Sequence, residues 1–219
     1  MVAAVVLAAG ASTRFGSPKQ ALLLKPVLAR VRRARSVEHV VVVLGAHAVE
    51  AAAETVHCPD WERGPGASLR CGLAALGPDM EAVVVVLADG PDLAPEAIDR
   101  VVAAWRESGT DVVAATYGGD RSHPVLLARA AWSRIPDAGA RDLEALAVPC
   151  DDLGSPGDID VVSDLPRRFK AGAAELSVLR DDEPPAAAAA DPTAGPDEVA
   201  APESPPPAQA DPGGGREAG

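Results

Sequence analysis

Four continuous runs of apolar, mostly β-branched residues restrict the possible folds of this chain more than any other feature. They span Val2–Leu7, Val40–Leu44, Val83–Leu87 and Asp111–Thr116. Runs without alternating polar residues are typical of strands that are buried on both faces of a sheet. Each run therefore predicts an interior strand rather than a strand with one face in water.

Helical patterns separate these runs, at roughly Gln20–Arg35, Ala46–Ala53, Ala67–Leu76 and Pro95–Glu107. Pro95 is expected in the first helical turn, where its missing N–H is not needed. Strands that alternate with helices favour right-handed crossovers and a parallel sheet. The sequence predicts an α/β fold, a three-layer α/β/α sandwich with a mostly parallel, Rossmann-like central sheet.

Charge and composition change towards the C-terminus. Residues 181–219 hold nine acidic residues and one arginine, and so carry −8 of the net charge of −12. The same residues include nine prolines and a run of alanines. Such a segment buries too little apolar surface to fold. We expect a folded domain over residues 1–170 and a disordered, acidic Pro/Ala-rich tail over residues 171–219. The mildly acidic body argues against nucleic-acid binding.

No apolar stretch approaches the roughly 20 residues that span a bilayer. The run Val2–Ala9 has no basic segment before it and predicts a strand rather than a signal peptide. We therefore expect a cytoplasmic protein that does not bind membranes. Cys58, Cys71 and Cys150 are widely spaced, which predicts reduced, packed thiols rather than disulfides or a zinc site.

A loop of small residues follows the first predicted strand. Small residues allow a phosphate to approach backbone N–H groups, and Gly10 can adopt the torsion of a tight turn. Arg14 offers a planar fork for phosphate oxygens, and Lys19 offers a compact charge on a long stem. The loop matches neither GxxxxGK[ST] nor GxGxxG. These residues alone predict either a phosphate site or an ordinary turn between strand and helix.

The segment Leu7–Gln20 resembles the LAAGxSxRxGxxK signature of the MobA-like nucleotidyltransferases, and Pro18–Gln20 adds the PKQ ending of cytidylyltransferase members. The resemblance spans about residues 2–166 and implies a fold of the nucleotide-diphospho-sugar transferase type. It implies that Arg14 and Lys19 are catalytic and neutralise the α-phosphate and the departing pyrophosphate. The residues that it implies for nucleotide binding in this loop are Leu7, Ala8, Ala9, Gly10, Ala11 and Ser12.

A second segment, Asp60–Arg70, resembles the DWxxGxxxSL motif of the family. By this resemblance Gly64 and Ser68 contact the base or the ribose. From the residues alone, Trp61 is either a packing residue or a platform for the base, and Ser68 could equally begin a helix.

Acidic residues suggest a metal site. Asp89 ends the third apolar run, where open α/β sheets place their ligands, and Mg²⁺ suits a carboxylate there. The alternative is that Asp89 caps the following helix, although Asp92 is the better candidate for a cap. The resemblance implies that Asp89 binds the metal. The segment Gly157–Leu165 resembles the closing DIDTPEDL motif, in which Asp158 or Asp160 is the second ligand, and Asp158 is favoured.

Two further segments resemble family motifs on the acceptor side. Arg121–Val125 is similar to the GHPV turn, and Gly139–Leu143 is similar to the GAR-L segment. The resemblance implies that His123 and Arg141 bind the acceptor. His123 is either a phosphate ligand or a turn residue bonded to backbone, whereas the fork of Arg141 suits a phosphate.

Together the motifs resemble a molybdenum cofactor cytidylyltransferase. The resemblance implies a Mg²⁺-dependent nucleotidyltransferase that moves CMP from CTP onto a phosphorylated acceptor, molybdopterin, and releases pyrophosphate. One alternative is a guanylyltransferase, or another NTP transferase that acts on a different phosphorylated metabolite. Another is a nucleotide-binding partner protein without turnover.

Overall fold

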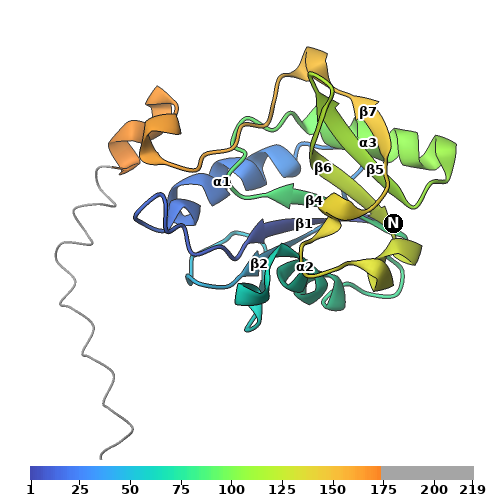
Figure 1. Cartoon of the computed structure of the whole chain (residues 1–219), viewed down its shortest axis with the longest axis horizontal. Helices are drawn as coiled ribbons and strands as arrows, with labels where there is room; N and C mark the ends of the chain where they lie inside the picture. Colours follow the sequence, from blue (N-terminus) through green and yellow to red (C-terminus); the bar gives the residue numbers. More distant parts are fainter. Residues whose placement is uncertain (174–219) are drawn as a thin grey trace, which may run out of the picture. The chain divides into compact units, whose positions relative to one another are not determined.

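A computed structural model describes residues 1–173, and the predicted tail beyond them lies outside the described residues. Within the described part, seven strands form one sheet in the order β3-β2-β1-β4-β6-β5-β7 (Figure 1). The strands are β1 Val2–Ala8, β2 His39–Leu44, β3 Glu54–His57, β4 Ala82–Leu87, β5 Val112–Tyr117, β6 Asp120–Ala128 and β7 Leu146–Pro149. The α-helices are α1 Lys19–Val31, α2 Pro65–Ala74 and α3 Pro95–Ser108, the last with its proline in the first turn as predicted.

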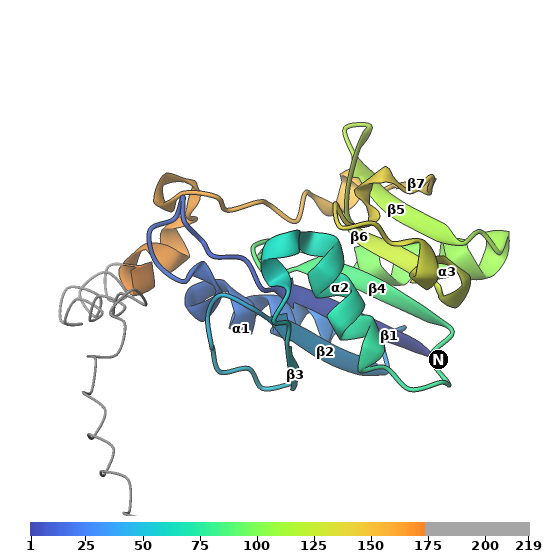
Figure 2. The same cartoon turned by 60° about the horizontal axis from the view of Figure 1, so that its bottom comes forward.

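The sheet is flanked by helices on both faces (Figure 2). Side chains of β1 alternate between two buried clusters: Ala4 and Val6 pack in the cluster with α1 and α3, and Ala3 and Val5 pack in the cluster with α2. A strand that is apolar on both sides can only lie between two covering layers. The predicted three-layer sandwich is confirmed.

One strand runs against the others. β6 pairs antiparallel with both β4 and β5, while the remaining pairs in the described sheet are parallel. Gly118 and Gly119 join β5 to β6, both with positive φ, as a two-residue hairpin requires. Arg121–Val125, which the sequence predicts as a turn, therefore lies in a strand.

The predicted helix at Ala46–Ala53 is absent, because residues 45–53 form an irregular connection to β3. The Ala46 N–H donates to the carbonyl of Ala9 over 3.0 Å, and the ring of His47 lies 2.9 Å from the carbonyl of Ala11. The segment therefore bonds to the loop after β1 instead of to itself. A helix this short has little stability of its own, so tertiary contacts decide its conformation.

The prediction of reduced thiols was wrong for two of the three cysteines. Cys58, which follows β3, and Cys71, on α2, form a disulfide with their Cα atoms 5.7 Å apart. Both pack on the α2 face of the sheet, and this proximity depends on β3, which the sequence pattern did not reveal. Cys150 is a buried free thiol, as predicted.

A third, smaller hydrophobic cluster joins the loop after β1 and helix α1 to the C-terminal part of the described chain. Phe15 from the loop and Leu23 from α1 pack with Ile159, Leu165 and Ala173. This cluster holds the returning chain beside the loop after β1 (Figure 1). The division between domain and tail at residue 170 stays a prediction. In residues 1–173, no helix is both long and apolar enough to cross a bilayer.

Candidate functional site

The loop between β1 and α1 is fixed by one buried side chain, Gln20. Its Nε2 donates to the carbonyl of Gly10 over 2.6 Å, and its Oε1 accepts from Ser12 Oγ over 2.9 Å. Two residues of this loop have a positive φ, Ser12 with 54° and Gly16 with 82°, so the torsional freedom of Gly10 that the sequence suggests is not used. Gly10 instead has open space where a Cβ would lie. The loop is therefore held in shape before any ligand arrives.

The loop forms one wall of a cavity of about 260 Å³. Of the eleven residues around this loop cavity, eight were singled out from the sequence: Leu7, Ala8, Gly10, Ser12, Arg14, Lys19, Asp89 and Asp160. Ala9 and Ala11 do not line it, because their carbonyls face the segment at Ala46 and His47. The cavity combines small residues on one side with two cations and two carboxylates on the other.

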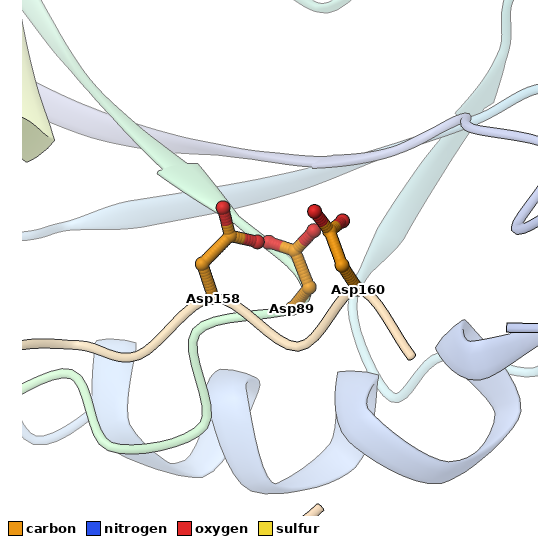
Figure 3. Close-up of side chains that lie close together, drawn as sticks. All are labelled: Asp89, Asp158 and Asp160. Atoms are coloured by element: carbon orange, nitrogen blue, oxygen red, sulfur yellow. The ribbon is translucent and has the colours of Figure 1, made fainter. Parts of the chain in front are cut away.

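Three carboxylates meet beside this cavity. Oxygen atoms of Asp89, Asp158 and Asp160 lie within 4.8 Å of one another, and Figure 3 shows the three groups turned toward a common centre. Asp89 follows β4, and the other two come from the returning chain, whose Ile159 N–H donates to the carbonyl of Asp89 over 3.3 Å. Gly90 permits this approach, because a Cβ there would lie 3.3 Å from the backbone of residues 156 and 157.

Two positively charged side chains, Lys19 and Arg14, form ion pairs with these carboxylates. Lys19 Nζ lies 2.8 Å from Asp89 Oδ2 and 3.6 Å from Asp160 Oδ1, and it donates to the carbonyl of Ile159 over 2.7 Å. Arg14 Nη1 lies 2.7 Å from Asp160 Oδ2. Lys19 is 15% exposed, whereas Arg14 is 71% exposed. The two predicted catalytic cations and the three predicted metal ligands thus form one cluster.

The carboxylates suit a hard divalent ion. Asp89 Oδ1 is buried without a hydrogen-bond partner in the described residues, so one ligand atom is unused. Burial raises the pKa of Asp158, and the negative charges of Asp89 and Asp160 raise it further. A divalent cation would relieve this repulsion, and Mg²⁺ and Mn²⁺ accept such oxygen ligands.

The alternative role for Asp89, as a helix cap, does not occur. Ala94 is the N-cap of α3, and it makes no side-chain capping bond. Asp92, the better candidate for a cap from the sequence, pairs instead with Arg168. Both aspartates therefore make contacts with distant parts of the chain, which local spacing does not reveal.

A second cavity, of about 420 Å³, adjoins the first, and Leu7 lines both. Apolar side chains such as Leu69, Val85 and Val125 cover part of its surface. His123, Arg141 and Asp158 provide polar groups. We name it the second cavity. The carboxylate cluster lies at the junction, because Asp89 and Asp160 line the loop cavity and Asp158 lines the second.

Arg121 is a residue of the second cavity that sequence reasoning missed. Its guanidinium donates to the carbonyls of Ala140, Arg141 and Leu143, at 2.9, 3.1 and 2.5 Å. Arg121 thus fixes the segment that carries Arg141, which is exposed in the 3-10 helix Ala140–Asp142. Burial lowers the pKa of Arg121, and Asp142 opposes this shift.

His123 lies on β6 and faces the second cavity. Burial lowers its pKa to about 4, from an ordinary value near 6.5, and the charges of Arg121 and Arg141 add to this shift while Asp89 opposes it. The imidazole is therefore neutral at physiological pH. It can donate one hydrogen bond and accept another, but it does not add a positive charge to the cavity.

This depressed pKa makes stability depend on pH. Between pH 6.5 and 4, His123 is protonated in the unfolded chain but not in the folded protein. The free energy of unfolding therefore decreases, by up to about 3 kcal/mol, as the pH is lowered through this window. We expect the Tm of the wild type to fall more steeply over this window than that of His123→Gln. Thermal unfolding at a series of pH values tests this, and equal slopes would contradict it.

The residues predicted to bind base or ribose lie outside both cavities. Gly64 is the N-cap of α2, and Ser68 is buried inside α2 rather than at its start. Trp61 packs against the core cluster on the α2 face, and a Cβ at Gly45 would lie 2.7 Å from its side chain. For Trp61 the packing alternative is favoured. Pro65 and Leu69, on the same helix, are the residues that reach the second cavity.

Comparisons with known proteins agree with this architecture. The model of the family described as "MobA-like NTP transferase domain" matches residues 4–153. The bifunctional protein GlmU of Cutibacterium acnes is 36% identical over 122 residues, which are 49% of this chain and 29% of that protein. The chain therefore spans less than a third of this curated relative.

Solved structures extend the likeness over most of the chain. A homologue of Mycobacterium tuberculosis Rv0371c from Mycobacterium sp. strain JC1 is 25% identical, with a TM-score of 0.63 over 81% of this chain and 98% of that chain. The complex of Rv0371c from M. tuberculosis H37Rv with manganese is also 25% identical, with a TM-score of 0.61 over 78% and 98%. A structure of CMP:2-keto-3-deoxy-manno-octonic acid synthetase complexed with CTP, 12% identical, shares the fold alone, with a TM-score of 0.58 over 80% of this chain and 99% of that chain.

Proposed function

This protein belongs to the MobA-like NTP transferase family, and we propose that it transfers CMP from CTP onto the phosphate of a small acceptor, molybdopterin, in the presence of Mg²⁺. Membership of the family rests on the match over residues 4–153 and does not depend on this proposal. The nucleotide, the acceptor and the metal ion are what the proposal adds.

One observation carries the proposal most strongly. The carboxylate cluster lies where two cavities meet, with Asp89 and Asp160 on one side and Asp158 on the other. A transferase must hold a donor and an acceptor on either side of the reacting phosphorus. A protein that only bound a nucleotide would not need the second cavity.

In the proposed reaction, an oxygen of the acceptor phosphate attacks the α-phosphorus of the NTP. The bond from this phosphorus to the oxygen that bridges to the β-phosphate breaks, and pyrophosphate leaves. Lys19 and Arg14 stabilise the charge that develops on the α-phosphate and the leaving group. An acceptor phosphate is already ionised near neutral pH, so no general base is required.

The chain's other residues position the two substrates. Leu7, Ala8, Gly10 and Ser12, in the loop that Gln20 holds, border the triphosphate. The segment held by Arg121 places Arg141 beside the acceptor. Asp89, Asp158 and Asp160 would hold Mg²⁺, which acts as a Lewis acid on phosphate oxygens when bound. A manganese complex of a structure 25% identical to this chain supports a divalent ion of this kind.

The choice of CTP and molybdopterin is supported by motifs. Leu7–Gly10 reads LAAG and Pro18–Gln20 reads PKQ, as in the cytidylyltransferases that this chain resembles. A guanylyltransferase, or a transferase for another phosphorylated metabolite, remains the alternative within the same site.

Pyrophosphate release by the full chain, with each of the four NTPs and Mg²⁺, tests the proposal. We expect release with CTP that depends on added molybdopterin. Release with GTP in place of CTP would contradict the nucleotide assignment. Release with CTP and other phosphorylated acceptors, but not with molybdopterin, would contradict the acceptor. Binding of CTP without release for any acceptor would contradict the transferase itself.

A further inference from the structure

We infer that Lys19 occupies the cation position of the carboxylate cluster until an NTP displaces it, so that the divalent ion and the nucleotide bind together. The inference rests on the proposed function for the identity of the nucleotide. It concerns a second role for a residue already placed beside the phosphates, in the state that precedes nucleotide binding.

The contacts of Lys19 place its ammonium group inside the cluster. Its Nζ has three oxygen neighbours: Asp89 Oδ2 at 2.8 Å, the Ile159 carbonyl at 2.7 Å and Asp160 Oδ1 at 3.6 Å. An ammonium has three N–H donors, so these neighbours engage most of its hydrogen-bonding capacity. At 15% exposure, the side chain is directed to the carboxylates rather than into solvent.

The position of Lys19 reduces the negative charge that a metal ion would meet in the carboxylate cluster. Three carboxylates meet in the cluster, and Lys19 and Arg14 offset two of their charges. A free divalent ion would meet little net negative charge and would share Asp89 with an ammonium group. Asp89 Oδ1 remains available, but repulsion from Nζ weakens binding there. Without Lys19, the cluster would present a charge that matches a divalent ion.

A triphosphate changes this balance. The loop cavity is lined by Gly10, Ser12 and Arg14 as well as by Lys19, so phosphates bound there compete with Asp89 for the ammonium. The flexible four-carbon stem of a lysine allows it to turn from one anion to the other. Once Lys19 contacts phosphate, Asp89 and Asp160 are free for the ion. By linkage, the nucleotide and the ion must then strengthen each other's binding by the same factor.

Binding of Mn²⁺ alone to the full chain, without nucleotide, tests the inference directly. The EPR signal of unbound Mn²⁺ measures the affinity of the wild type, Lys19→Met and Lys19→Gln. Methionine removes the charge, and glutamine removes it while keeping an N–H donor for the Ile159 carbonyl. We expect both variants to bind Mn²⁺ about tenfold more tightly, within the usual range for coupled sites. Lys25→Met, which removes an exposed charge from α1, should bind Mn²⁺ as the wild type does.

Unchanged or weaker Mn²⁺ binding in both Lys19 variants would overturn the inference. A second arm measures the Mn²⁺ complex of CTP, without acceptor, by equilibrium dialysis. We expect Lys19→Met to bind this complex more weakly than the wild type while it binds free Mn²⁺ more tightly. If no variant binds CTP but Lys19→Met still gains Mn²⁺ affinity, the role of Lys19 in the free protein stands and the proposed nucleotide falls.

Discussion

Replacing Lys19 by alanine is expected to lower kcat for pyrophosphate release at least about a hundredfold, the usual loss for one oriented group that stabilises developing charge. The side chain is 15% exposed, so little water can take over its role. Arg14→Ala should cause a smaller loss, since the Arg14 side chain is 71% exposed and water screens its charge. Steady-state kinetics with saturating CTP and acceptor measure both effects.

The control for charge is Lys25→Ala, on the exposed face of α1. It removes the same charge from the same helix without touching the carboxylates, and we expect wild-type kcat. A Lys19→Ala variant with near-normal kcat would exclude Lys19 from the chemistry. A rise in KM for CTP at constant kcat would show that Lys19 binds the ground state and the transition state equally and does not act in the chemical step.

The strands that the sequence reveals are those that are buried over most of their length. β1, β2, β4 and β5 lie between helices and read as continuous apolar runs, so their positions follow from composition alone. β6 begins with four residues that are exposed or half-buried, and its first half therefore reads as a loop. β3 and β7 have four residues each, too few for a pattern.

The same distinction holds in the site. Asp89 could be recognised because a carboxylate directly ends an apolar run. The ion pair between Lys19 and Asp89 could not be predicted, because it joins positions 70 residues apart. Arg121 could not be recognised either, since an arginine that bonds to three carbonyls has the same sequence context as one in solvent. Local sequence patterns predict which charged side chains could serve in a site. Which of these side chains contact one another depends on how distant loops pack together, which the patterns do not reveal.

Asp89→Asn is expected to lower kcat about a thousandfold, which corresponds to about 4 kcal/mol of lost charge stabilisation. Asparagine keeps the size of the side chain but removes the charge that both Lys19 and a divalent ion require. We also expect Mn²⁺ binding without nucleotide to weaken at least about tenfold, about as much as the loss of a group that supports a metal ligand. Asp92→Asn is the matched control. It removes a carboxylate from the same loop, but this carboxylate pairs with Arg168 and not with Lys19, so we expect kcat and Mn²⁺ binding close to those of the wild type.

The two substitutions, Asp89→Asn and Lys19→Met, break the same 2.8 Å ion pair. If this pair only stabilised the fold around the cavity, both variants should lose Mn²⁺ affinity together. If Asp89 is a ligand and Lys19 a competitor, the affinities must move in opposite directions, down for Asp89→Asn and up for Lys19→Met. EPR titrations of the two variants beside the wild type separate these cases, and parallel losses would exclude Asp89 as the group that Lys19 and the metal ion share.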